Sequence, residues 1–258
     1  MNTIVAIASV VLREMIRRKD FYVLFVLTAL VTVVLGSVGF FGDASIARYV
    51  KEQCLLLIWI AMLVIALTSA ARQIPAEKEG RTLLPLLAKP VTRGQVIAGK
   101  FLGCWLACGA CLVVFYVFFA LMAATREHET HWMLTVQALW LHWWVLGILV
   151  AMGLAGSVLF AAPSSNTTIC LVVAGGILVV GRHLNKVAAS LAEPGRTIVG
   201  ALYYAMPHLE WYDVRALVVH NYEPLPWWVC GVATLYAAAY IGAFLSLGWV
   251  LFRRKSVV

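Results

Sequence analysis

Hydrophobic and polar residues alternate along this chain in long blocks. A bilayer-spanning helix needs about 20 predominantly apolar residues, and six apolar blocks approach or exceed that length. The fifth block is the shortest, and we expect its helix to extend by a few residues at either end. The pattern predicts an all-α polytopic membrane protein with six transmembrane helices. The predicted spans are residues 21–42, 52–71, 96–124, 133–162, 167–181 and 227–252.

Residues 1–19 follow a different pattern, in which apolar side chains recur at helical spacing. Ile4, Ile7, Val11 and Met15 form one apolar face, and a cluster of basic residues follows it. In a secretion signal the positive charges precede the apolar run, so this order argues against a signal peptide. We predict an amphipathic interfacial helix on the cytoplasmic surface; a frayed tail is the alternative.

Lys and Arg residues give the orientation of the spans, because they concentrate in cytoplasmic loops. Thirteen of the twenty fall on the side of the termini and seven on the other side, while eight of the twelve acidic residues lie on that other side. Both termini are therefore predicted to be cytoplasmic. The outer connections at 43–51 and 125–132 are expected to be short loops.

Composition supports a membrane location. Sixty-three per cent of the residues are hydrophobic and 12% are charged, whereas a soluble domain has about 45–50% apolar and about 25% charged residues. The net charge of +8 raises the possibility of nucleic acid binding, but that needs basic residues on a water-exposed face. Here they lie between apolar blocks, so we expect membrane lipid around the chain and no nucleic-acid partner.

The outer segment, residues 182–226, is the longest connection between predicted spans. It is rich in Tyr and Trp, which anchor proteins at the headgroup level. Pro194, Pro207, Pro224 and Pro226 divide it into short pieces. We interpret the segment as a belt and cap on the outer leaflet; a surface that handles substrate is the alternative.

Residues 94–101 match the start of a phosphate-binding loop, but the Ser or Thr that must follow the lysine is replaced by Phe101. Nucleotide binding by this chain is therefore not expected. Small residues instead recur every four positions in the same segment, which is typical of close helix packing in membranes. These helix-packing residues are Gly99, Gly103, Ala107 and Cys111.

Cysteine and histidine residues give no complete metal site in the sequence. Cys104, Cys108 and Cys111 share one helix, but no histidine or carboxylate on that segment completes a site, so we expect them to pack as small apolar residues. His142 is expected at the outer membrane interface. His128 and His131, in the segment 127–131, are expected to lie in a solvated turn. A metal site in the outer segment stays an alternative, because three histidines share that segment: His183, His208 and His220. We find no nucleophile–base pair and predict no catalytic residues.

A conspicuously charged connection, residues 73–94, lies between the second and third spans. Pro75 and Pro90 bracket a segment expected to be helical, with Glu77 and Glu79 in its first turns, where the helix dipole favours acidic side chains. Leucines give this segment an apolar side and Lys and Arg a basic side. Such a helix can dock on a soluble partner or merely rest on anionic headgroups.

The sequence of residues 77–103 resembles the first cytoplasmic loop and third-span start of permease subunits of the type-2 class of ABC exporters. The six-span layout and the amphipathic N-terminal helix are similar as well, and residues 206–215 resemble a stretch after the fifth span in several members. The shared loop positions are Glu77, Glu79, Arg81, Thr82, the run Leu86 to Val91, Arg93, Gly99 and Lys100.

The resemblance implies that the loop is a coupling helix that docks on a separate cytosolic ATPase, which would carry the ATP and Mg. A chain with six spans would pair with a second permease subunit, identical or not. The implied function is the permease half of an ATP-driven exporter in a bacterial cytoplasmic membrane, not an enzyme. An assembly or maturation factor for a metal or cofactor and an intramembrane enzyme are the alternatives. The implied ATPase-coupling residues are Glu77, Glu79, Arg81, Thr82, Leu86, Lys89 and Arg93.

Overall fold

The computed structural model describes residues 3–37, 43–80, 91–125, 132–160 and 162–254, and all regular structure in these ranges is helical. The predicted all-α class is therefore confirmed. The elements are α1 (Thr3–Arg17), α2 (Lys19–Ser37), α3 (Asp43–Ala71), α4 (Pro75–Glu79), α6 (Arg93–Ala124), α7 (Trp132–Leu159), α8 (Pro163–Ser190), α9 (Gly195–Ala205), η1 (Leu209–Tyr212), α10 (Arg215–Val219) and α11 (Trp227–Arg254).

Five helices in the described ranges are long and apolar enough to cross a membrane. They coincide with the second to sixth predicted spans. At the position of the first predicted span, α2 contains a shorter apolar helix, Phe21–Val34. The chain is thus a multi-pass helical membrane protein, with five described spans and a shorter apolar helix where the first span was predicted.

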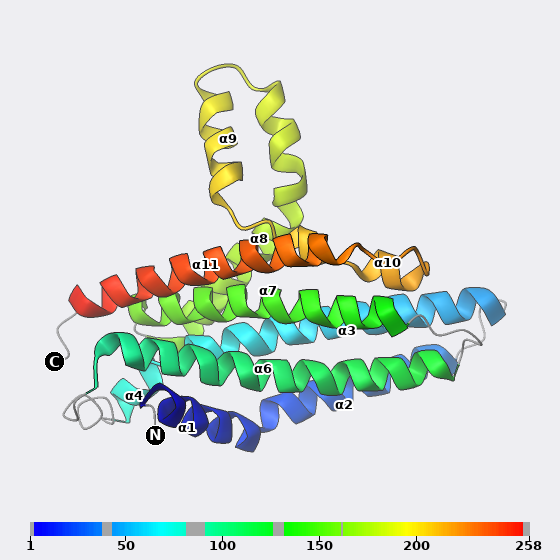
Figure 1. Ribbon diagram of the computed structural model, residues 1–258, viewed down its shortest axis with the longest axis horizontal. Coiled ribbons are helices and arrows are strands. Elements are labelled where there is room, and N and C mark those ends of the chain that lie inside the picture. Colours follow the sequence, from blue (N-terminus) through cyan, green and yellow to red (C-terminus); the bar gives the residue numbers. More distant parts are fainter. Residues whose placement is uncertain (1–2, 38–42, 81–90, 126–131, 161, 255–258) are drawn as a thin grey trace.

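The helices α2, α3, α6, α7 and α11 run side by side along the long axis of the molecule (Figure 1). α7 is the central helix: it packs along α11 and against α3 and α6, and most of its residues are buried. α1 begins and α11 ends at the same end of this bundle, where α4 also lies, while α10 lies toward the opposite end.

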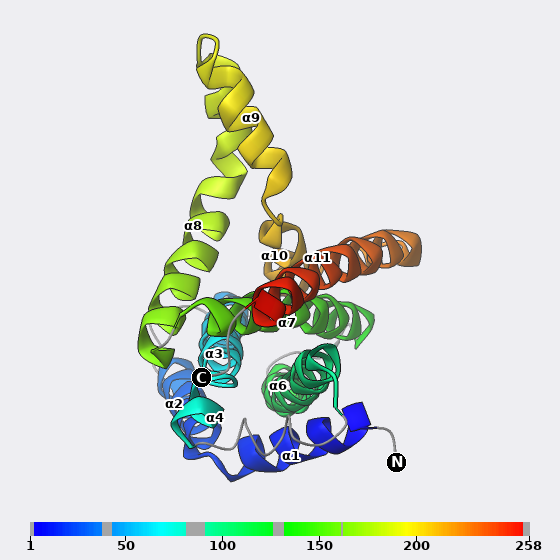
Figure 2. The ribbon, with the colours of Figure 1, turned by 90° about the vertical axis from the view of Figure 1, so that its left-hand side faces the viewer.

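The second half of α8 leaves the bundle and forms an antiparallel hairpin with α9 (Figures 1 and 2). The sequence contains no proline between Pro163 and Pro194, so nothing interrupts the helix near residue 181, where we predicted the fifth span to end. The apolar range long enough to cross a membrane, Pro163–Gly181, ends at the predicted position, while α8 itself continues to Ser190. None of the residues of α9 is buried, which leaves Ile198 and Leu202 exposed on this projection.

The outer connection predicted as a loop at 43–51 is helical, and that prediction is wrong: α3 begins at Asp43. The added turns are held by tertiary contacts that sequence reasoning did not include. Val50 and Lys51 are both buried, and Lys51 Nζ donates a hydrogen bond of 3.0 Å to Asn221 Oδ1 in the connection between α10 and α11. The other predicted loop, 125–132, lies mostly outside the described residues.

Candidate functional site

The candidate site is built around α4, at the end of the bundle where α1 begins. Pro75 occupies the first turn of α4, where its missing N–H costs no hydrogen bond. The N–H of Ala76 donates to the carbonyl of Arg72 (3.0 Å), and that of Gly80 donates to Ala76 (3.0 Å). α4 therefore follows α3 after a single turn and is aligned by the preceding span.

A buried lysine fixes α4 to the bundle. Lys100 of α6 is 2% exposed, and its Nζ lies 2.6 Å from Glu77 Oε1. The same ammonium donates hydrogen bonds to the backbone carbonyl of Gln73 (3.0 Å) and to Gln73 Oε1 (3.4 Å). We call Gln73, Glu77 and Lys100 the α4 anchor. A buried charge is tolerated when it is paired and hydrogen-bonded, and here the pairing joins the short helix α4 to α6.

The beginning of α6 is fixed on its other side to α11. Thr92 forms a capping box with Gln95, in which each side chain bonds the other residue's backbone N–H. Arg93 then donates through Nη1 to the carbonyls of Phe252 (2.5 Å) and Arg253 (3.0 Å). These carbonyls belong to the last turn of α11, where helices leave acceptors unsatisfied and favour cations.

The small-residue stripe of α6 faces α1. A Cβ built on Gly99 would lie 2.8 Å from Ile7 Cβ, and one built on Gly103 would lie 2.7 Å from Val11 Cβ and 2.8 Å from the carbonyl of Ala8. The close approach of α1 to α6 therefore requires glycine at both positions. Farther along the stripe, Ala107 is buried and Cys111 is half-buried.

The predicted ATPase-coupling residues fall into three groups. Glu77 binds Lys100 inside the chain, and Arg93 binds α11. Glu79 is exposed at the end of α4, next to the exposed Lys78. The remaining predictions, Arg81, Thr82, Leu86 and Lys89, lie outside the described residues.

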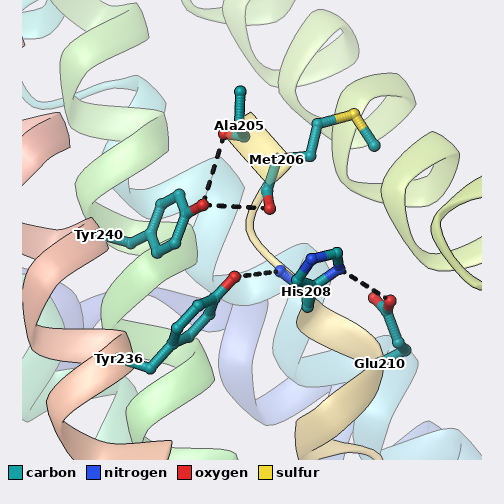
Figure 3. A network of polar contacts seen from close by, with 6 residues as sticks. All are labelled: Ala205, Met206, His208, Glu210, Tyr236 and Tyr240. Atoms are coloured by element: carbon teal, nitrogen blue, oxygen red, sulfur yellow. Dashed lines mark hydrogen bonds and ion pairs between the residues drawn. The ribbon is translucent and has the colours of Figure 1, made fainter. Parts of the chain in front are cut away.

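A second polar cluster holds the connection after α9 against α11 (Figure 3). The N–H of His208 donates to the hydroxyl of Tyr236 (3.0 Å), and Tyr240 donates to the carbonyl of Met206 (3.1 Å). His208 Nδ1 lies 3.1 Å from Glu210 Oε1, and both side chains are only 9% exposed. Two tyrosines of one span therefore fix the base of the α8–α9 hairpin.

Beyond this cluster the connection is held by a charge pair. Arg215 donates two hydrogen bonds to the carboxylate of Asp213, at 2.7 and 2.9 Å. Burial raises the pKa of Asp213, but the hydrogen bonds and charge of Arg215 outweigh burial and bring the pKa below its ordinary value. Asp213 is therefore ionised at neutral pH and the pair is intact.

His142 does not lie at the outer interface as expected. It is buried in the bundle, its ring centroid lies 4.5 Å from that of Trp59, and its Nδ1 is 2.6 Å from the hydroxyl of Tyr116. The flanking tryptophans suggested an interface, but α7 is the central helix and turns this side chain inward. No group of three His, Cys, Asp or Glu among the described residues is placed to hold a metal ion.

Lys100 is the residue whose importance sequence reasoning missed. It falls inside the predicted span 96–124, and an ionisable side chain within a span is by default a functional candidate with a partner to be found. We counted Lys100 as a topology signal and as a position of the loop motif, and did not ask which residue it pairs with. The His208–Glu210 pair gave no comparable signal, because it depends on packing against α11.

Comparison with known proteins gives the same family as the loop motif. No curated protein matches the chain. Residues 5–257 match the family described as ABC-2 family transporter protein, which extends the resemblance from the loop to nearly the whole sequence. The chain therefore belongs to the ABC-2 transporter family of membrane permeases.

Proposed function

We propose that this chain is the permease subunit of an ATP-driven exporter, coupled through α4 to a separate cytosolic ATPase. The observation that carries the proposal is the α4 anchor. A helix of five residues has too few hydrogen bonds to be stable alone, yet an ion pair of 2.6 Å with the buried Lys100 joins α4 to α6. Force applied to α4 is thereby transferred to a span.

In this proposal the chain crosses the bacterial cytoplasmic membrane six times, with α2 as the first span and both termini in the cytoplasm. α1 is the interfacial helix, and a second permease subunit completes the translocation pathway. ATP and Mg are bound and used by the partner ATPase. The chain itself performs no chemical reaction; it converts the movement of α4 into a change in the arrangement of its spans.

The contacts with the ATPase divide between two kinds of residue. Glu79 and Lys78 are exposed on α4 and can contact the ATPase directly, together with the sequence-based candidates Arg81, Thr82, Leu86 and Lys89. Glu77 and Arg93 bind within the chain, so their contribution is to transmit the displacement. In this proposal Glu79 contacts the ATPase, and Glu77 transmits the displacement of α4 to α6.

The test is the variant Glu79→Lys, with Glu223→Lys as a matched control. Both glutamates are exposed, but Glu223 lies near the opposite end of the bundle, before α11. Truncating one partner of a buried interfacial charge pair costs about 2–5 kcal/mol, and each 1.4 kcal/mol is a factor of ten in affinity. Reversing the charge should weaken the ATPase contact at least as much.

We expect Glu79→Lys to accumulate in the membrane like the wild type but to lose co-purification with the ATPase or stimulation of ATP hydrolysis. The control should retain both properties. If Glu79→Lys is indistinguishable from the control in both measurements, Glu79 lies outside the interface, and the same outcome for Arg81→Glu would leave α4 without the proposed role.

A further inference from the structure

A cavity of about 880 Å³ opens between α2, α3, α6 and α8. Its volume lies within the range of about 300–1,000 Å³ that is usual for small-molecule sites. One part of its wall is formed where α1 gives way to α2, and another by the last turn of α3 and the first turns of α8. The cavity is thus located at the end of the bundle that also carries α4.

The wall at this end is positively charged. Arg18, Lys19 and Arg72 all line the cavity, and none of the described lining residues is acidic. Lys19 and Arg72 are exposed, so their charges can reach a molecule that enters from the membrane surface. Arg18 is half-buried and already interacts within the chain. The first turn of α8, which receives no side-chain cap, adds the backbone N–H of Ser164 at the cavity wall.

The remainder of the cavity is apolar. Phe21 and Leu24 of α2 face Val64 of α3 and Val114 of α6 across it, and Ala110 leaves space between them. A cationic rim that leads into an apolar cleft between membrane helices is complementary to one kind of molecule. That molecule has an anionic headgroup and a hydrocarbon chain.

We propose that this cavity binds an anionic phospholipid of the surrounding leaflet, with its phosphate at Lys19 and Arg72 and one acyl chain between α2 and α6. The chain's own neighbouring segment, residues 81–90, carries two basic residues and no acidic one, so like charges disfavour it as the occupant. The bilayer supplies phospholipid at high local concentration.

The assignment to the cytoplasmic leaflet rests on the orientation given under Proposed function, whereas lipid binding itself does not depend on the ATPase. An anionic lipid at this position would contact α2, α3, α6 and α8 together and hold the end of α3, which leads directly into α4. Lipid bound here therefore favours one arrangement of α4 relative to the spans.

The experiment uses the purified full chain in zwitterionic-lipid nanodiscs and titrates phosphatidylglycerol that carries a fluorescent acyl chain. Phosphatidylcholine with the same labelled chain tests the charge, and glycerol phosphate as competitor tests the headgroup alone. Each basic residue near an anionic lipid contributes roughly a fivefold gain in affinity. We expect Arg72→Gln to weaken phosphatidylglycerol binding about fivefold, and Arg196→Gln, an exposed arginine of α9, to leave it unchanged.

Ala110→Trp is the second variant, because Ala110 is exposed to the cavity rather than packed in the core. It should fill the apolar cleft and abolish saturable binding without loss of the folded protein. Equal affinity for the two lipids, unchanged binding in Arg72→Gln, or displacement by glycerol phosphate alone would each overturn the proposal. Glu79→Lys should bind lipid normally, so failure of lipid binding and failure of ATPase coupling are separate results.

Discussion

The α4 anchor allows a quantitative test, because its two charged side chains differ in their exposure to water. Lys100 is 2% exposed and Glu77 is 25% exposed. Removing one partner of a buried ion pair typically costs about 3–5 kcal/mol, because the remaining charge stays buried without compensation. Glu77→Leu leaves such a charge on Lys100, with only the two oxygens of Gln73 as acceptors.

Lys100→Met should cost less, since the Glu77 side chain is 25% exposed as a whole, although its Oε2 atom is buried; a lost charged hydrogen bond is worth about 1.5–3 kcal/mol. In the double variant neither charge remains, and replacing a buried pair by apolar residues is often neutral or stabilising. We therefore expect the order of stability to be wild type or double variant first, then Lys100→Met, then Glu77→Leu.

The assay is the apparent thermal midpoint of the purified chain in one detergent. For a chain of this size about 1 kcal/mol corresponds to about 2–4 °C, so Glu77→Leu should lower the midpoint by about 6–20 °C. Lys78→Leu, a neighbouring substitution at an exposed position, is the control. If Glu77→Leu shifts the midpoint no more than Lys78→Leu, or if the double variant is less stable than both single variants, the ion pair does not hold α4 as we describe.

Two further predictions test packing and orientation. Gly103→Leu forces α1 away from α6, because even a Cβ there would lie 2.7 Å from Val11 Cβ. Overpacking costs about 1–3 kcal/mol, so the thermal midpoint should fall further than in Leu102→Ala; equal, negligible shifts would contradict the contact. For orientation, Lys78→Cys should react with an impermeant thiol reagent only in inverted vesicles and Glu223→Cys only in intact cells, against a wild-type background of six cysteines; the reverse pattern would invert the proposed topology.

Hydropathy predicted the positions of five described spans because each is a long apolar block, and length and composition alone identify such blocks. The boundary of α8 was harder to predict. The fifth span, predicted as 167–181 with an extension of a few residues at either end, matches the apolar range Pro163–Gly181, whereas backbone hydrogen bonding continues the helix to Ser190. Polarity predicts the limit of the membrane better than the end of a helix.

The candidate site was predicted only in part, for a physical reason. The loop motif identified the segment of α4, but Lys100 and Glu77 are 23 positions apart, and nothing in a single sequence shows that their side chains meet. The same holds for His208, whose backbone N–H is satisfied by Tyr236 of another helix. Such contacts depend on how helices cross, and the periodicity of one helix contains no information on that crossing.

The contacts around α4 indicate which parts of the chain move together. α4 is joined to α6 by Lys100, α6 to the end of α11 by Arg93, and α6 to α1 by the close approach at Gly99 and Gly103. A packed interior transmits displacement rather than absorbing it. We therefore expect a displacement of α4 to move the end of α3 together with α1, α6 and the end of α11 against α8, on the far side of the proposed lipid cavity. The cavity would then change in width as α4 moves, so lipid binding and ATPase docking would be linked through α6, and by reciprocity each would alter the affinity for the other.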